Sequence, residues 1–280
     1  MKVVKTISEV RDIISAQKKM GKSIALVPSM GFLHEGHGSL MNAARKESDF
    51  VVVSIFVNPT QFGENEDYSV YPRDLEKDTV FCESHGVDLV FAPEVEEMYS
   101  NPKISVKVVE ISEMLCGKTR PIHFAGVCTI VSKLFNIVTP DYAYFGQKDA
   151  QQFYILQKMV QDLSFGVQLR RCPIIRESDG LAKSSRNVYL NSEERISALS
   201  LSKAIFTAQE KVKVGMQTAP ILSEMKNIIE ATPHTKIDYV EAVDLDTFRE
   251  TDTIGKNTLF AMAVYVGKTR LIDNFILEEV

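Results

Sequence analysis

The sequence predicts an α/β protein with an open parallel sheet and helices on both of its faces, followed by a smaller C-terminal α+β domain. Strand-like and helix-like segments alternate over the first 175 residues, as in sheets built from right-handed crossovers. The run FVVVSIFV at 50–57 is rich in β-branched residues and does not alternate, which is typical of a strand buried on both faces. Beyond residue 176 the order changes to a polar segment, two helical segments and then strands.

Periodicity and end signals assign the elements in turn. Thr6 and Glu9 have capping-box spacing at the start of a helix that Gly21 ends. In the first part of the chain we expect further helices ending near 48 and at 76–86, 124–138 and 150–163, and strands at 23–29, 50–57, 87–93, 142–146 and 166–175. In the remainder we expect a loop or linker at 176–194, helices at about 192–214 and 219–231, and strands at 236–245, 258–267 and 269–277. These assignments place one domain at 1–175 and the other at 176–280.

Composition excludes several classes of partner. The 280 residues carry a net charge of −5, with a pI near 5.7, so no broad electrostatic attraction to nucleic acid or anionic membrane is expected. The N-terminus lacks the apolar region of a secretory signal, and no segment approaches the apolar length of a membrane span. Four scattered cysteines without a C-x-x-C pair indicate buried reduced thiols in a cytoplasmic protein.

The segment PSMGFLHEGHGSL at 28–40 is the strongest candidate for a site. A strand that turns into a helix start presents unpaired backbone N–H groups and the positive end of a helix dipole, which suits a phosphate. Gly31 and Gly36 let an anion approach the backbone, and His34 and His37, three residues apart, fall on one helix face. A polar loop with incidental histidines is one alternative. Zinc is another, with further ligands from His85 or His123.

Three more polar clusters follow expected strand ends or the domain boundary. The loop at 57–74 begins with Asn58 and Gln61, whose carboxamides suit a ligand with hydroxyl and carboxylate groups. YFGQKDAQQF at 144–153 brings Lys148 as a charge for phosphate and Asp149 for a ribose hydroxyl or a metal. GLAKSSRNVYL at 180–190 offers hydroxyls and cations that form a mobile clamp on phosphates. A solvated loop, a plain helix cap and a solvated linker are the respective alternatives.

These motifs resemble a known family. HEGH is similar to the HxGH signature of the nucleotidyltransferase superfamily that includes class I aminoacyl-tRNA synthetases, and KSSR resembles its second signature. The fuller set, PSMGFLHEGH, SIFVNPTQFG, YPRD, YFGQKDAQQ and DGLAKSSRNVYL, resembles the pantoate–β-alanine ligases, or pantothenate synthetases, over essentially the whole chain.

The resemblance implies an ATP-dependent ligase that makes pantothenate through a pantoyl adenylate and releases pyrophosphate and AMP. It also implies a Rossmann-like N-terminal domain that binds ATP and pantoate, a C-terminal lid, a requirement for Mg²⁺, a cytoplasmic location and a homodimer. The Mg²⁺ ligands do not follow from the sequence. No nucleic acid or membrane partner is expected.

Carried over by position, the resemblance assigns individual residues. The ATP-binding residues would be Met30, Gly31, Phe32, Leu33, His34, Glu35, Gly36, His37, Gly146, Gln147, Lys148, Asp149, Ile175, Lys183, Ser184, Ser185 and Arg186. Pantoate and β-alanine would be held by Gln61, Gln152 and Asn58. The catalytic residues would be His34, His37, Lys148, Ser184, Ser185 and Arg186. Because charge grows on the phosphates, we expect His37 to act mainly by donating hydrogen bonds to their oxygens.

The chain departs from the usual family pattern at four positions, and two rival functions stand beside the ligase. Ser29 replaces a usual threonine, Gly38 a leucine, Lys183 a methionine and Ile122 a glycine. The loss of a leucine at Gly38 removes an apolar contact beside His37, and Lys183 adds a cation. One rival is a nucleotidyltransferase that acts on a phosphate acceptor. The other is a non-catalytic nucleotide sensor.

Overall fold

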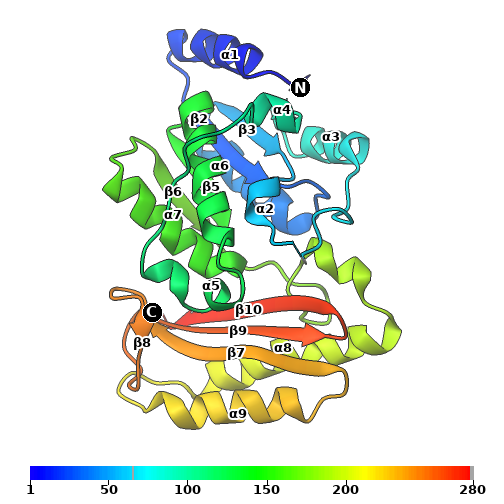
Figure 1. Cartoon of the computed structure of the whole chain (residues 1–280), viewed down its shortest axis with the longest axis vertical. Helices are drawn as coiled ribbons and strands as arrows, with labels where there is room; N and C mark the ends of the chain where they lie inside the picture. Colours follow the sequence, from blue (N-terminus) through cyan, green and yellow to red (C-terminus); the bar gives the residue numbers. More distant parts are fainter. Residues whose placement is uncertain (65, 278–280) are drawn as a thin grey trace. The chain divides into compact units, whose positions relative to one another are not determined.

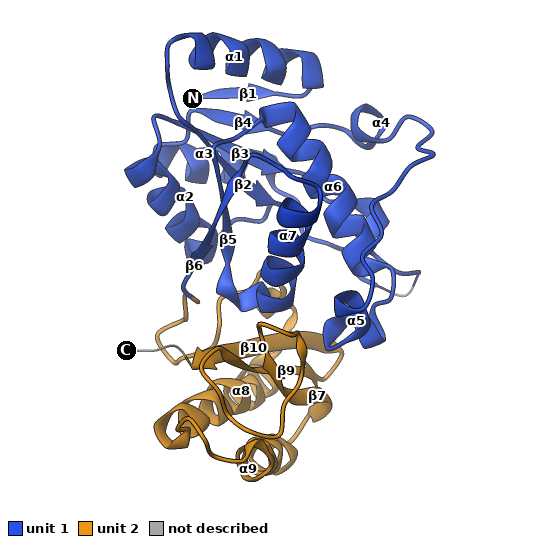
Figure 2. Cartoon of the chain, turned by 90° about the vertical axis from the view of Figure 1, so that its left-hand side faces the viewer, with its two compact units in different colours: residues 1–173 blue, residues 174–280 orange. Residues whose placement is uncertain are grey.

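The computed structural model describes residues 1–64 and 66–277, which form two compact units. Unit 1 spans Met1–Pro173 and unit 2 spans Ile174–Val280, coloured separately in Figure 2. The boundary expected from sequence, after residue 175, falls two residues later than this division. Within the described ranges no helix has both the length and the apolar character needed to cross a membrane.

Unit 1 is built on a parallel sheet of six strands (Figure 1). The strands are β1 (Lys2–Val4), β2 (Ile24–Ser29), β3 (Phe50–Ile55), β4 (Leu89–Phe91), β5 (Tyr142–Gly146) and β6 (Gln168–Cys172). Their order is β1-β4-β3-β2-β5-β6, and the register places Leu26 of β2 opposite Val52 of β3 and Ala143 of β5. The open parallel sheet is confirmed. The edge strand β1 was not predicted, because three residues before a helix give no period.

Helices cover both faces of this sheet, as predicted (Figure 2). On one face, α2 (Glu35–Glu47) and α3 (Leu75–Ser84) pack Met41, Ala44 and Cys82 against strand residues such as Val53. The helices α1 (Ile7–Lys19), α6 (His123–Val138) and α7 (Ala150–Asp162) lie on the other face. The remaining helical segments are short: α4 (Val95–Met98), α5 (Cys116–Thr119), and the 3₁₀ turns η1 (Pro59–Gln61), η2 (Ile111–Glu113) and η3 (Gln147–Asp149).

The strand order predicts a ligand site next to β2. From β2 the chain proceeds through β3 and β4 in one direction along the sheet, and β5 and β6 continue it in the other. The direction in which successive strands are added to the sheet therefore reverses between β2 and β5. Ligands of open α/β sheets bind beyond the carboxyl ends of the strands at such a point. The segments that follow β2, β3 and β5 carry three of the four predicted polar clusters.

Unit 2 is an α+β layer with its own core. Helices α8 (Ser192–Lys211) and α9 (Thr218–Glu230) pack on an antiparallel sheet in the order β10-β9-β7-β8. The strands are β7 (Thr235–Asp244), β8 (Arg249–Glu250), β9 (Thr258–Val266) and β10 (Thr269–Leu277). Leu201, Ile205 and Met225 from the helices meet Phe260 and Phe275 from the strands, whose rings stack at 4.8 Å.

The segment at 176–194 is largely a loop up to the start of α8, as predicted, but it is not simply solvated. Arg176 pairs with Ala182 in a β-bridge, and Ser185–Tyr189 form the 3₁₀ turn η4. The guanidinium of Arg176 binds the carboxylate of Asp273 on β10 through two hydrogen bonds of 2.6 and 2.9 Å. Arg176 thus attaches this segment to the sheet of unit 2. Composition alone cannot distinguish such a polar residue from a solvated one.

Candidate active site

The turn between β2 and α2 has an unusual backbone. Gly31 has φ +86° and Phe32 has φ +51°, so two consecutive residues occupy the left-handed region. A side chain at residue 31 would also collide with Asp78, because a Cβ there would lie 2.9 Å from the Oδ2 atom. Glycine is therefore required at this position on both grounds.

The two histidines cap the helix that follows this turn. His34 is the N-cap of α2, with φ −145° and ψ 177°, and His37 is three residues into the helix. The prediction that both histidines lie on one helix face is wrong for His34, because this residue precedes the first residue of the helix. The rings nevertheless meet, with centroids 4.2 Å apart.

Their hydrogen bonds fix the tautomer of each ring. Nδ1 of His34 accepts from the Gly36 N–H at 3.1 Å, and Nδ1 of His37 accepts from the His34 N–H at 3.2 Å. A neutral imidazole that accepts at Nδ1 carries its proton on Nε2. Both side chains therefore offer Nε2–H as a donor.

The backbone N–H groups of the turn, by contrast, already have protein acceptors. Gly31 donates to Ser29 Oγ at 2.8 Å, and Phe32 and Leu33 donate to the carboxylate of Asp78, each at 2.7 Å. The N–H groups of His34 and Gly36 are used in the cap. The prediction of an anion site made from unpaired backbone donors is therefore wrong for these residues. We therefore expect side chains to make the main contacts with an anion here.

The ring of His37 stays neutral at physiological pH. Its pKa is lowered from 6.5 to about 3, first by burial and then by nearby His34 and Lys148, while Asp149 opposes the shift. Lys148 and Asp149, which follow β5, therefore lie within electrostatic reach of the ring that follows β2. The Lys148 Nζ atom lies 3.3 Å from the Asp149 carboxylate. That carboxylate does not cap α7, so the plain-cap alternative for Asp149 is not supported.

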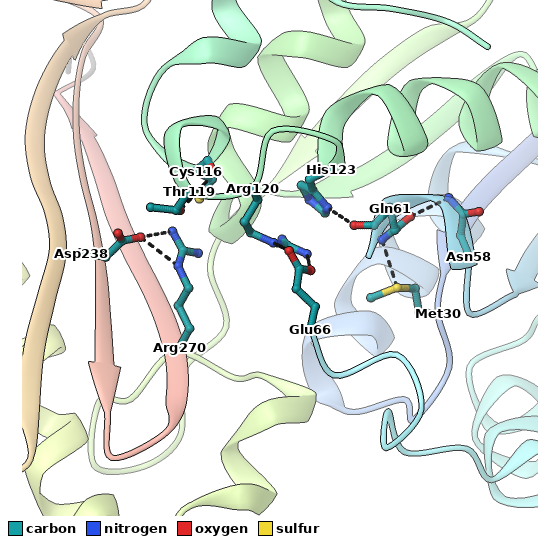
Figure 3. Close-up of polar contacts among 10 residues, drawn as sticks. All are labelled: Met30, Asn58, Gln61, Glu66, Cys116, Thr119, Arg120, His123, Asp238 and Arg270. Atoms are coloured by element: carbon teal, nitrogen blue, oxygen red, sulfur yellow. Dashed lines mark hydrogen bonds and ion pairs between the residues drawn. The ribbon is translucent and has the colours of Figure 1, made fainter. Parts of the chain in front are cut away.

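A second network fixes the carboxamide of Gln61 (Figure 3). Asn58, which is buried, donates from Nδ2 to the Gly126 carbonyl at 3.2 Å and to Gln61 Oε1 at 3.0 Å. Asn58 Oδ1 accepts from Thr60 and from the Tyr99 hydroxyl. Because a backbone carbonyl can only accept, the orientation of both amides is determined. Gln61 therefore presents its NH₂ group, which contacts Met30 Sδ at 3.1 Å.

The polar side-chain atoms of Asn58 thus all bind other protein groups, and Asn58 supports Gln61. A direct contact of Asn58 with pantoate stays a prediction, and so does the contact of Gln152, which lies in the first turn of α7. Gln151, its neighbour, instead ties residues 111–116 to α7 through Ile111, Met114 and Cys116.

Arg120, Glu66 and His123 flank this network; Arg120 and Glu66 were not predicted, and His123 was considered only as a zinc ligand. His123 Nδ1 donates to the Gln61 carbonyl at 3.0 Å, and burial lowers the His123 pKa to about 4 (Figure 3). Arg120 Nε lies 2.9 Å from Glu66 in a half-buried ion pair. Looking for polar residues at the ends of predicted strands cannot find these contacts, because they are made between loops that are remote in sequence. Zinc is not supported either, since the described residues contain no cluster of three or more ligating side chains.

The lysine–serine–arginine segment belongs to unit 2. Ser184 caps η4 by accepting from the Arg186 N–H at 3.2 Å, and the Lys183 N–H donates to the Ile175 carbonyl at 2.9 Å. Ile175 and Lys183 are thereby brought together, as expected for one binding segment. Convergence of this segment with the histidines on one triphosphate stays a prediction.

Two of the departures noted in the sequence have structural explanations. The space beside Gly38 is filled by another side chain, because a Cβ there would lie 2.6 Å from His85 Nε2 and 3.1 Å from Phe81. The His85 and Phe81 rings pack at 4.3 Å and so replace the contact that was expected to be lost. Ile122 takes φ −92° and ψ −14°, a conformation open to any residue.

Comparison with known proteins gives one consistent result. The family model described as Pantoate-beta-alanine ligase matches residues 2–276. A pantothenate synthetase of Ruminiclostridium cellulolyticum is 58% identical over 277 residues, covering 98% of each chain. The crystal structure of the Thermus thermophilus pantothenate synthetase is similar with a TM-score of 0.94 and 40% identity over 100% of both chains.

A Francisella tularensis structure extends the comparison to a complex. This pantoate-beta-alanine ligase, complexed with beta-gamma ATP and beta-alanine, is similar with a TM-score of 0.82 and 33% identity. It covers 100% of this chain and 99% of its own. Matches of this identity and coverage leave no part of the described fold outside the likeness. The chain belongs to the pantoate–β-alanine ligase family.

Proposed function

We propose that this chain condenses pantoate with β-alanine at the expense of ATP and produces pantothenate, AMP and pyrophosphate. The observation that carries the proposal is the pair of histidines with fixed Nε2–H donors beside Lys148, at the point where the parallel sheet reverses. Such donors suit a reaction in which negative charge grows on phosphate oxygens.

The first step would form pantoyl adenylate. A pantoate carboxylate oxygen attacks the α-phosphorus of ATP, and the bond to the β-phosphate oxygen breaks as pyrophosphate leaves. His34 and His37 donate from Nε2 to phosphate oxygens, and Lys148 adds a positive charge. Because the pKa of His37 is about 3, the neutral ring donates a hydrogen bond and does not transfer a proton. The attacking carboxylate is already ionised, so no general base is needed.

The second step would form the amide. The neutral amine of β-alanine attacks the acyl carbon of the adenylate, AMP leaves, and the nitrogen loses a proton. The NH₂ group of Gln61, held by Asn58, donates to pantoate, and Gln152 supports it from α7. Ile175, Lys183, Ser184, Ser185 and Arg186 would hold ATP from unit 2.

Mg²⁺ fits the residues present. Mg²⁺ is usually held by one or two carboxylates together with substrate phosphates, and does not need an all-protein cage. Asp149, half-exposed beside Lys148, would supply such a carboxylate. When bound, the ion would neutralise charge on the phosphates.

We further propose a cytoplasmic homodimer. All four cysteines are buried and none forms a disulfide, which suits a reducing compartment. The proposal of a dimer rests only on the resemblance to the family, and sedimentation at two protein concentrations tests it.

One assay tests the ligase against its rival. The enzyme is incubated with ATP, Mg²⁺, pantoate and β-alanine, and AMP is measured over many turnovers. Sustained AMP release that requires both acids is expected. A nucleotidyltransferase acting on a phosphate acceptor would release pyrophosphate without AMP, and AMP release independent of either acid would contradict the proposal.

A further inference from the structure

Asp78 is a buried carboxylate that belongs to no predicted site. It lies in the first turn of α3, and only 2% of its surface is exposed. Its two oxygens face the turn between β2 and α2: Oδ2 accepts from the Phe32 N–H and Oδ1 from the Leu33 N–H, each at 2.7 Å. The burial of Asp78 could not be predicted from the sequence, because Asp78 follows Asp74 and Glu76 at the charged start of a helix.

Burial of this group is costly and needs an explanation. Desolvation raises the pKa of Asp78, although the two backbone hydrogen bonds oppose the shift. Packing of α3 on the sheet would be served equally well by an apolar residue. What the carboxylate adds is two acceptors side by side, which match two consecutive N–H groups. An amide offers one acceptor and would turn its NH₂ group toward the other N–H.

The turn that Asp78 holds leads directly into the histidine cap. Phe32 is in the left-handed region, which a bulky residue adopts only when its surroundings hold it there. Leu33 is followed at once by His34, whose N–H fixes His37 and whose ring fixes Gly36. The direction of both Nε2–H donors therefore depends on the position of residues 32 and 33.

We infer that Asp78 is a positioning residue for adenylate formation, acting through the backbone of Phe32 and Leu33 on the orientation of His34 and His37. The inference rests on the ligase activity proposed above. It predicts that loss of the carboxylate impairs the chemical step in molecules that are correctly folded.

The test compares Asp78→Asn with a matched variant, Asp141→Asn. The Asp141 Oδ2 atom also accepts a backbone N–H at 2.7 Å, that of Ile24, but at the opposite end of β2. Pyrophosphate release is followed in a single turnover with saturating ATP and pantoate, and the amplitude is used to count active sites. For Asp78→Asn the rate constant is expected to fall about 10- to 100-fold, since misplaced catalytic donors cost rates of this order. Asp141→Asn should react as the wild type does.

The outcomes separate the explanations. A merely structural role would lower the amplitude and leave the rate constant unchanged, which would overturn the inference. Asp78→Glu, which keeps the charge, is the second variant: if Asp78→Asn does not fold, Asp78→Glu should fold and show the slow step. If neither folds, a structural role is the better account and the inference falls. Wild-type enzyme that releases no pyrophosphate would instead refute the proposed function.

Discussion

At the residue scale, the chemistry of the site depends on which atom of each side chain remains to face a ligand. In the histidine cap, Nδ1 of both rings accepts a backbone hydrogen bond, so the proton is on Nε2, and the Gln61 oxygen accepts from Asn58, so the Gln61 NH₂ group faces away from Asn58. These assignments follow from backbone groups whose donor or acceptor character is invariant. They give the site a set of hydrogen-bond donors, as a triphosphate and a carboxylate require.

Removal of the His37 donor should slow adenylate formation. His37→Ala is expected to reduce the single-turnover rate of pyrophosphate release by about 10²–10³-fold, the usual loss for one preorganised donor. His234→Ala, on the surface of unit 2, serves as the control and should change nothing. A His37→Ala rate within about threefold of wild type would remove His37 from the mechanism.

Burial of His37 should also make stability depend on pH. Its pKa is about 3 in the folded chain and 6.5 in the unfolded chain, so between these values the unfolded chain binds more protons. The free energy of unfolding must therefore fall as the pH is lowered through this window. Urea unfolding at pH 7 and pH 5 should show a smaller loss for His37→Asn than for wild type. Equal losses would contradict the burial of a neutral ring.

The orientation of Gln61 predicts a selective defect. Gln61→Ala removes a donor to an ionised substrate, which is worth roughly 1.5–3 kcal/mol, or about 10- to 100-fold in affinity. Pantoate binding should weaken by this factor and ATP binding much less, as measured by calorimetry of each ligand alone. Equal weakening of both ligands would argue against the placement.

At the element scale, the loop at 57–74 is attached to the rest of unit 1 by a half-buried ion pair. Glu66 and Arg120 have side chains that are 23% and 17% exposed, whereas the pair Lys158–Asp162 on α7 is 57% exposed on both sides. Ion pairs of the first kind lie between the exposed and buried extremes in strength. The ion pair between Glu66 and Arg120 thus holds the loop that carries Gln61 against the rest of unit 1.

Loss of this pair should loosen the loop. Glu66→Gln is expected to cost about 1–2 kcal/mol locally and to speed chymotryptic cleavage after the buried residue Phe62 by about tenfold. Asp162→Asn, which disrupts the exposed pair, should leave the cleavage rate unchanged. Similar cleavage of both variants would show that the Glu66 pair does not fasten the loop.

Elements with a clear period were predictable from sequence, and contacts between loops were not. The parallel strands and the long helices follow from β-branched runs and helical spacing, as at 50–57 and 124–138. The positions of His34, Gln61 and Lys148 follow because strand ends meet at one edge of a parallel sheet. The roles of Asp78, Glu66 and Gln151 do not follow, because each acts on residues more than thirty positions away through geometry that only the fold creates.

At the scale of the whole molecule, the two units have separate cores, and each has its own polar anchors. In unit 2 the carboxylate of Asp273 is 1% exposed and binds both Arg176 and the Asn274 N–H. Through Arg176 it holds the segment that leads to Ser184 and Arg186. The stability of unit 2 is therefore linked to the placement of its predicted ATP-binding residues.

Asp273→Asn should destabilise unit 2 selectively. Removal of one partner from a buried ion pair costs about 3–5 kcal/mol, because the other charge stays buried. Amide hydrogen exchange should accelerate in β10 and in the segment at 176–190, while β3 in unit 1 stays protected. Equal acceleration in both units would show that they unfold as one.

The internally satisfied turn after β2 has an evolutionary consequence. A loop that binds an anion through main-chain amides does so whatever side chains it carries, so point mutations change its anion binding little. Here the amides of residues 31–34 donate to acceptors within the protein, so we expect recognition to depend on imidazole, lysine and carboxamide groups. Each of these groups is specified by a single codon. Ligand preference at this site can therefore be retuned one substitution at a time, without rebuilding the loop beneath it.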